Sequence, residues 1–244
     1  MDNALYVGLS RQLTLRRELD IVANNIANMD TTGFKVESLM VETEPASPAQ
    51  TFGAPRPVKF VLDRSVGRDF GQGTLRSTGA TFDLGLQGDG FFTIQTPEGE
   101  QYTRDGRFHM DPDGRLVTED GNAVMAEGGE IVIDPQLGPV NIAKDGTVSQ
   151  GRELLGKISV VRFNELSMLE KVGENRYRNT ANAQPEPATN TDVHQGMLEG
   201  SNVKPIAEIT RMIEVTRAYE SMAKMMDANS ELSRRSIERM GKLN

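Results

Sequence analysis

Glycine is distributed unevenly along the chain, and this feature constrains the fold more than any other. Sixteen of the 24 glycines lie between Gly71 and Gly156. Tight turns therefore concentrate in the middle of the 244 residues, whereas the two ends are free to form long helices. The sequence predicts a three-part plan, with a helical segment at each end and a turn-rich body between them.

The N-terminal end has the apolar spacing of a single amphipathic helix. From Asn3 to Asn28, apolar residues recur every three or four positions, and Leu9 and Leu13 flank this register. The register consists of Leu5, Leu15, Leu19, Val22 and Ile26. The helix is expected to end near Gly33, because glycine readily adopts the left-handed conformation that closes a helix.

The C-terminal end has a second apolar stripe at the same spacing. Asn202 is expected to cap this helix, and Pro205 falls in its first turn, where the missing N–H group needs no helical partner. The stripe consists of Met212, Val215, Tyr219, Met222 and Met226. Acidic and basic residues alternate on a neighbouring face from Glu208 to Glu220, which supports a helix but indicates no function.

The C-terminal helix needs another helix as its partner. Unbroken, it would be about 60 Å long, which is too long for its stripe to be buried on a small β-domain. The N-terminal helix is the obvious partner. The stripe could form either a core within one chain or a seam between chains in an assembly, and the polar linker before the helix favours the seam.

The middle of the chain alternates short apolar runs with turn signals. Residues 91–94, 102–104 and 108–110 are followed by turns such as Asp105-Gly106. Further apolar runs occur at 116–118, 131–133, 140–142 and 158–161. These runs predict a β-rich domain of mainly antiparallel strands. The expected fold class is therefore α+β, with terminal helices that pair in a coiled-coil-like layer.

Composition also suggests where the parts begin and end. We expect an N-terminal helix and turn at 1–44, a proline-containing connector at 45–70 and the β-rich domain at 71–179. Residues 180–200 are expected to form a linker, because residues 180–192 include no large apolar side chain. Residues 201–244 would then form the second helix.

Composition argues against several functional classes. The net charge of −8 and the pI near 5.0 argue against nucleic-acid binding. No apolar run approaches the roughly 20 residues that cross a bilayer, and the N-terminus lacks the features of a cleaved secretory signal. The terminal helices have no basic face that would bind a membrane surface. The chain has no cysteine, and we expect no cofactor, no metal and no enzymatic activity.

Two polar groups have both a structural and a functional interpretation. Asn24, Asn25 and Asn28 could fix the register between subunits through amide hydrogen bonds, or could simply end a helix. Asp111 and Asp113 resemble the start of a calcium loop, but the later ligands are missing from the required positions, so a hairpin turn is favoured.

An enzymatic alternative rests on the acidic β-rich middle. Carboxylates such as Asp83 and Asp89 could form a glycosidase pair, so a secreted carbohydrate-active or cell-wall-binding protein is the alternative function. His109 and His194 are the only histidines and stand far apart in different segments, which argues against a two-histidine metal site or a serine triad.

Distinct sequence motifs occur at both ends and in the middle of the chain. The N-terminal motifs are Ala23–Asn28 and Thr31–Lys35. The C-terminal motifs are Leu198–Val203, Met212–Glu214 and Arg217–Glu220. The central motifs include Gly88–Phe92, Tyr102–Gly106 and Gly114–Val117. Together these motifs resemble those of the bacterial flagellar axial proteins, the rod and hook family. The opening residues Met1–Tyr6 and Gly200 are most similar to the proximal-rod members, with the distal-rod members next.

This resemblance implies a structural subunit of the proximal rod of the flagellar basal body. Such a subunit would leave the cell through the flagellar export apparatus without a cleaved signal peptide, and would join the rod that spans the periplasm. Its partners would be other rod proteins and copies of itself, with no nucleic acid and no membrane insertion. Its terminal segments would be mobile in the monomer and would form a helical inner layer on assembly, which transmits motor torque. The assembly interface would comprise the two apolar helix stripes, the three asparagines, Asn202 and Val203.

Overall fold

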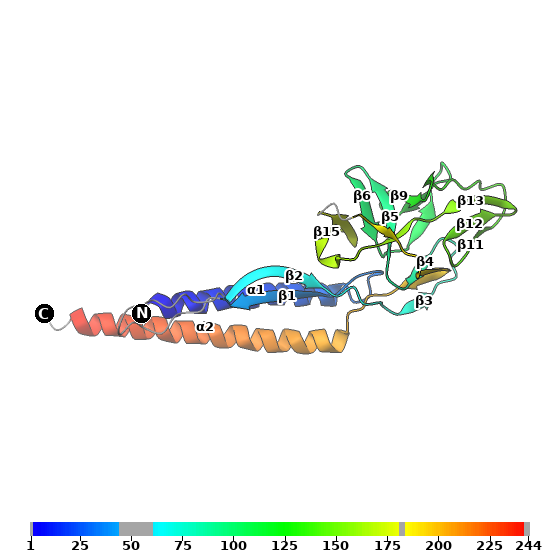
Figure 1. The fold of residues 1–244 in the computed structure, drawn as a ribbon. Helices are drawn as coiled ribbons and strands as arrows, with labels where there is room; N and C mark the ends of the chain where they lie inside the picture. The colour runs from blue at the N-terminus through cyan, green and yellow to red at the C-terminus, as the bar shows by residue number, and fades with distance from the viewer. Residues whose placement is uncertain (1, 44–60, 181–183, 242–244) are drawn as a thin grey trace. The chain divides into compact units, whose positions relative to one another are not determined.

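The computed structural model describes residues 2–43, 61–180 and 184–241, and the chain divides into two compact units (Figure 1). The first unit comprises Met1–Ala27, Glu37–Arg68 and Lys204–Asn244. The second unit comprises Asn28–Val36 and Asp69–Val203. Each unit is therefore built from stretches that lie far apart in the sequence.

The first unit contains two long helices and a β-hairpin. Its elements are α1 (Asp2–Ala27), β1 (Glu37–Thr43), β2 (Val61–Arg68) and α2 (Pro205–Gly241). At 1.5 Å per residue, the 26 residues of α1 extend about 39 Å and the 37 residues of α2 about 56 Å. The helices lie side by side and run in opposite directions (Figure 1). The helices predicted at the two ends of the chain are confirmed.

The hairpin of the first unit lies partly in the segment that we expected to be a connector. Strands β1 and β2 pair antiparallel, with a bulge between Met40 and Val41. Residues 61–68 therefore form a strand, because β1 supplies hydrogen-bond partners for a backbone that the sequence pattern left unassigned. The prolines at 45, 48, 55 and 57 lie outside the described residues.

The second unit is a β-domain in which every described strand pair is antiparallel. Its first strands are β3 (Leu75–Ser77), β4 (Leu84–Gln87), β5 (Phe91–Thr96), β6 (Gly99–Thr103), β7 (Phe108–Met110), β8 (Leu116–Thr118), β9 (Ala123–Ala126) and β10 (Gly129–Glu130). They are followed by β11 (Val140–Ile142), β12 (Thr147–Gln150), β13 (Glu153–Lys157), β14 (Val160–Arg162), the 3-10 helix η1 (Leu166–Met168), β15 (Leu169–Gly173), β16 (Arg176–Asn179), β17 (Glu186–Pro187), β18 (Asp192–Gln195) and β19 (Met197–Glu199). The α+β class with mainly antiparallel strands is confirmed.

The largest sheet of the second unit has the strand order β15-β16-β6-β5-β9-β8-β7. Strand β10 pairs with β9, and β14 pairs with both β5 and β17. Strands β11, β12 and β13 form a separate sheet, and β18 with β4 and β19 with β3 form two-stranded pairs. The pairs β18 with β4 and β19 with β3 connect the last strands of this unit to its first strands.

The core of the second unit has two parts. The larger part contains Phe92, Ile94 and Val124, whose side chains are fully buried. The smaller part is aromatic, and the ring centroids of Phe91 and Tyr177 lie 5.8 Å apart in an edge-to-face arrangement. Because successive residues of a strand point to opposite faces, β5 contributes Phe91 to one part and Phe92 to the other.

The structure differs from the sequence prediction in two places within the β-domain. Residues 131–133 form only an isolated bridge, between Val132 and Arg115, although Ile131 and Ile133 are buried as the apolar run suggests. Residues 180–200 were expected to be a linker, yet they include β17, β18 and β19. The stretch 180–192 that lacks large apolar residues ends where β18 begins, and β18 and β19 contain Val193, Met197 and Leu198. Their backbones form hydrogen bonds with β4 and β3. The remaining segment boundaries stay predictions.

Candidate assembly surfaces

The apolar residues predicted on the two helices meet within the first unit. Leu15 is 2% exposed, and Val22 and Val215 are each 4% exposed. A Cβ atom placed on Gly8 would lie 3.2 Å from Cγ of Met226, so the backbone of α1 closely approaches the stripe of α2. The structure thus gives the stripe a partner inside the chain, which the linker argument had disfavoured. A seam between chains, and a coiled-coil layer in the assembly, stay predictions.

The other predicted interface residues lie in several settings. The half-buried residues on the two helices are Leu19, Ile26, Met212, Tyr219, Met222 and Met226. Asn24 is exposed, and the side chain of Leu5 lies outside the described part of the chain. Asn28, Asn202 and Val203 belong to the second unit, so the structure does not bring them together with the helical residues in one unit.

Asn25 is a buried polar residue between the helices, with 1% of its surface exposed. Its side-chain N–H group donates to the backbone oxygen of Glu37 at 2.8 Å and to Oε2 of Glu208 at 3.0 Å. Its Oδ1 accepts a hydrogen bond from the backbone N–H of Glu37 at 3.0 Å. The predicted amide hydrogen bonds were expected to join different subunits, whereas the amide of Asn25 joins two helices of one chain. A role for these asparagines in fixing the register between subunits stays a prediction.

Arg211, in the second turn of α2, pairs with Glu18 of α1. Nε of Arg211 donates to Oε1 of Glu18 at 2.8 Å, and the same guanidinium donates a second hydrogen bond to that oxygen. The alternating charges of α2 therefore do more than face solvent, because Glu208 and Arg211 both bind α1 residues. These polar contacts and the apolar core fix one alignment of α1 against α2.

Asn202 joins separate segments of the second unit. Its Oδ1 accepts from the backbone N–H of Val36 at 2.8 Å, and its side-chain N–H group donates to the backbone oxygen of Asp69 at 2.8 Å. The expectation that Asn202 caps the C-terminal helix is wrong. Helix α2 begins three residues later, and the amide of Asn202 is occupied by the neighbouring segments.

Three charged side chains form a buried cluster in the second unit. The side chains of Lys35, Arg104 and Glu199 are 1%, 3% and 0% exposed. Nζ of Lys35 lies 2.8 Å from Oε1 of Glu199, and NH1 of Arg104 lies 3.0 Å from Oε2. The backbone N–H of Gly73 also donates to Oε1 of Glu199, at 2.8 Å. This charge cluster (Lys35, Arg104 and Glu199) ties together four segments of the chain.

Burial lowers the pKa of Lys35 from its ordinary value, and the nearby carboxylate of Glu199 opposes that shift. The ammonium stays bound because it also donates to the backbone oxygen of Gly71 at 2.8 Å. Arg104 likewise donates to the backbone oxygen of Gly88 at 2.7 Å. These three residues were not predicted to form a site. Each of them is a charged residue within one of the motifs that resemble the flagellar family, and this shared position could have indicated that the three belong together.

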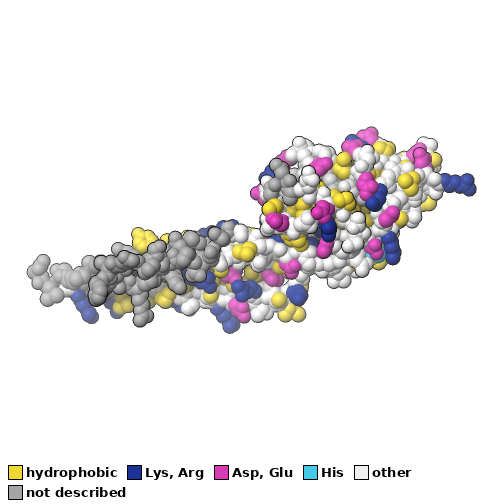
Figure 2. All heavy atoms as spheres, in the orientation of Figure 1, with side chains coloured by type: hydrophobic (Ala, Val, Ile, Leu, Met, Phe, Trp, Pro, Cys, Tyr) yellow, Lys and Arg dark blue, Asp and Glu magenta, His cyan; other side chains and the backbone are white. Residues whose placement is uncertain are grey.

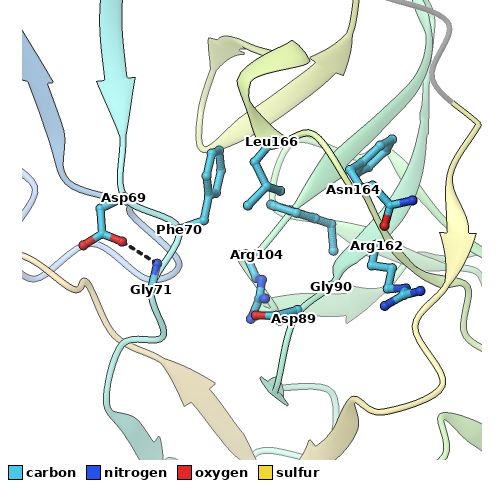
Figure 3. A pocket seen from close by; sticks show the side chains of 11 residues that line it. Asp69, Phe70, Gly71, Asp89, Gly90, Arg104, Arg162, Asn164 and Leu166 are labelled. Carbon is cyan, nitrogen blue, oxygen red and sulfur yellow. Dashed lines mark hydrogen bonds between the residues drawn. The ribbon is translucent and has the colours of Figure 1, made fainter. Parts of the chain in front are cut away.

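Arg104 of the charge cluster also lines a cavity of about 450 Å³ (Figure 3). Phe70, Phe91 and Phe163 line it together with Arg104 and Asp89. The guanidinium of Arg104 lies 5.3 Å from the ring centroid of Phe91, a cation–π contact. Among the described residues that line this cavity, Asp89 is present but Asp83 is not, so it does not bring together the two carboxylates of the glycosidase interpretation.

The turn at Asp111 is a hairpin, as predicted. Strands β7 and β8 pair across it, and the carboxylate of Asp111 accepts hydrogen bonds from the backbone N–H groups of Asp113 and Arg115 at 2.9 and 2.8 Å. These bonds, led by that from Arg115, hold the pKa of Asp111 below its usual value. Among residues 2–43, 61–180 and 184–241, no group of three His, Cys, Asp or Glu side chains is arranged to hold a metal ion.

The chain combines two paired terminal helices with an antiparallel β-domain that contains a buried charge cluster. None of the described helices is long and apolar enough to cross a membrane. Three family models match the chain. They are the flagella basal body rod protein at residues 5–35, the flagellar hook protein FlgE/F/G D1 domain at 85–150 and the flagellar basal body rod FlgEFG protein C-terminal region at 194–239.

Whole-chain similarity gives the same family. The chain is 60% identical to the flagellar basal-body rod protein FlgF of Caulobacter vibrioides, over 100% of both chains. It is 36% identical to FlgF of Mesorhizobium japonicum over 99% of both chains. It is 34% identical to the rod protein FlgG of Bacillus subtilis over 95% of this chain and 97% of the relative. The chain belongs to the flagellar basal-body rod protein family and is most like FlgF.

Proposed function

We propose that this chain is a structural subunit of the proximal rod, which polymerises through its terminal helices and transmits motor torque. The observation that supports this most is the full-length identity to FlgF, combined with the helical pair at the chain ends. The family match gives no support to the carbohydrate-active alternative.

The structure gives a physical basis for transmitting force. Two long helices held in one alignment by Asn25 and by the pair of Glu18 with Arg211 resist sliding past one another. In the β-domain, the charge cluster joins the segments that enter and leave the second unit. A force applied to one of these segments is therefore distributed over several buried contacts and does not act on a single flexible connection.

The proposal also covers the partners, the export route and the location of the subunit. Its partners are other rod proteins and copies of itself, and it reaches them through the flagellar export apparatus without a cleaved signal peptide. It lies in the part of the rod that spans the periplasm and acts without catalysis, cofactor or metal. These statements follow from the role of a rod subunit and from the motifs at the two ends of the chain.

Deletion of single helices tests the proposal. Removing 2–27 or 205–241 takes away one helix and leaves every residue of the second unit in place. Each deletion should abolish motility and remove the chain from isolated basal bodies, while tyrosine near-ultraviolet circular dichroism shows that the β-domain remains folded. Tyr102 and Tyr177 in that core supply the signal. A truncated chain that still enters the rod would contradict the proposal.

A further inference from the structure

Methionine is concentrated on α2 and is the only sulfur-containing residue type in the chain. Five of the 12 methionines lie in Pro205–Gly241, and the sequence has no cysteine. Thioethers are therefore the groups of this chain that a two-electron oxidant such as hydrogen peroxide attacks first. Figure 2 shows hydrophobic side chains, the class that includes methionine, at the surface of the first unit.

Two of these methionines pack against the backbone of α1. A Cβ atom placed on Gly8 would lie 3.3 Å from Sδ of Met226 and 3.9 Å from Sδ of Met222. Glycine has no side chain, so both sulfur atoms approach α1 without an intervening group. The two methionines are four residues apart, which places them on the same face of α2. We call this arrangement of Gly8, Met222 and Met226 the sulfur contact of the helical pair.

The sulfur contact is close to α1 and is also open to small molecules. Met222 and Met226 are half-buried, so part of each side chain reaches solvent. Met225 lies between them in the sequence and is 57% exposed. An oxidant can therefore reach all three residues, and the sulfur atoms of Met222 and Met226 are those that lie nearest to Gly8.

We infer that Met222 and Met226 form an oxidation site through which peroxide weakens the contact between α1 and α2. One oxygen atom of hydrogen peroxide is transferred to Sδ, which oxidises the thioether to a sulfoxide. The remaining atoms of the peroxide, reduced by the same two electrons, leave as water. This inference goes beyond the proposed function, because it requires only the helical pair of a single chain.

A sulfoxide does not fit the sulfur contact. A thioether is apolar, whereas a sulfoxide carries a polar oxygen that needs a hydrogen-bond donor when it is buried. Gly8 lies inside α1, where a backbone N–H group is bonded to the carbonyl four residues earlier and cannot serve as that donor. The position of a Cβ atom on Gly8 is only 3.3 Å from Sδ of Met226, so an oxygen added on that side has little room. The oxidised side chain must therefore bury an unpaired oxygen or leave the contact.

Treatment of the purified full chain with hydrogen peroxide tests the inference. Peptide mass mapping should show one added oxygen atom on Met222 and one on Met226. Urea denaturation followed by the helix signal at 222 nm should then show a lower midpoint than that of the untreated chain. The unfolding equilibrium constant of the helical pair should rise about tenfold or more, because the sulfoxides lose the apolar contact with α1.

Two matched variants separate the sulfur contact from the other methionines. In Met222→Leu/Met226→Leu, leucine fills the contact with a side chain of similar volume that peroxide does not oxidise. In Met40→Leu/Met225→Leu, two methionines of the same unit that are 56% and 57% exposed are replaced instead. Peroxide should lower the midpoint of this control variant as much as that of the wild type, and should change the midpoint of the first variant far less.

Enzymatic reduction gives a second measurement. The two methionine sulfoxide reductases, one for each sulfoxide epimer, should remove the added oxygen atoms and restore the midpoint of the wild type. The inference is overturned if peroxide oxidises Met225 but neither Met222 nor Met226, or if both variants respond to peroxide alike. It is also overturned if the midpoint stays low after the sulfoxides have been reduced.

Discussion

The ammonium of Lys35 lies 2.8 Å from Oε1 of Glu199, and the two residues are 164 positions apart in the sequence. Both side chains are buried, and Arg104 binds the other oxygen of the same carboxylate. One carboxylate thus balances two cations inside the β-domain. Removing it should cost more than removing either cation, because two buried charges would then lose their partner.

Glu199→Gln should lower the free energy of unfolding of the β-domain by about 3 to 5 kcal/mol. The amide keeps the shape of the side chain but leaves Lys35 and Arg104 without a counter-charge. Urea denaturation followed by tyrosine near-ultraviolet circular dichroism measures the change. Glu220→Gln on the exposed side of α2 is the control and should change stability by less than about 0.5 kcal/mol. Equal stability of the two variants would show that the charge cluster contributes nothing.

Lys35 should make stability depend on pH in the alkaline range. Its pKa is lowered by burial in the folded chain, whereas the unfolded chain has the ordinary value of 10.5. Between those two values the unfolded state binds more protons, so the contribution of Lys35 to stability rises with pH. Its slope is at most about 1.4 kcal/mol per pH unit for one group. Below the folded pKa this contribution is constant.

Lys35→Met isolates this effect. The difference in unfolding free energy between wild type and Lys35→Met should grow in favour of wild type as the pH rises toward 10.5. Urea denaturation of both chains at several values between pH 7 and pH 10.5 measures it. A difference that stays constant, or that falls with pH, would be inconsistent with a lysine whose pKa burial has lowered.

Gly106→Ala should strongly destabilise the β-domain. A Cβ atom at this position would lie 1.7 Å from the backbone oxygen of Leu84, so the two segments would have to separate. We expect a loss of about 3 kcal/mol, the upper end of the usual cost of overpacking. Gly128→Ala is the matched control, because its Cβ atom would have no atom within 4 Å. Thermal unfolding of both variants should show a large loss for the first and little change for the second.

A disulfide between positions 8 and 226 should form within one chain. The close approach of Gly8 to Met226 places the two side chains in reach of one another. The Gly8→Cys/Met226→Cys variant should oxidise to a monomer that unfolds at a higher temperature than its reduced form. Gly8→Cys with Leu232→Cys is the control, since Leu232 is 63% exposed. Links mainly between chains in the first variant would contradict the intramolecular helical pair.

Asn25→Ala should lower stability by about 1 to 3 kcal/mol, because the backbone groups of Glu37 and the carboxylate of Glu208 would lose a buried partner. Loss of helix signal at 222 nm during urea denaturation reports the change in the first unit. Asn24→Ala on the exposed side of α1 is the control and should have a smaller effect. Similar losses in the two variants would mean that the buried amide has no special role.

Much of the fold could be predicted from local sequence patterns. The spacing of Leu15 and Val22, and of Val215 and Met222, depends only on the helical period, so it predicted both helices and the faces that are buried. The hairpin at Asp111 followed from turn chemistry that needs no distant partner. The expected β-rich middle followed from the same short-range signals. Short strands such as β18 escaped prediction because their evidence is a backbone partner far along the chain.

Local sequence patterns are enough to predict two amphipathic helices that flank an antiparallel β-domain, because periodicity and turns are properties of neighbouring residues. The local patterns do not show that the buried faces of the helices meet within one chain and leave Leu9 and Ile209 exposed, because this depends on the packing of distant segments. The same packing brings Lys35 and Arg104 to Glu199. These three charged residues form a cluster because they are buried together. Their burial depends on contacts between distant segments, which the local spacing of residues does not predict.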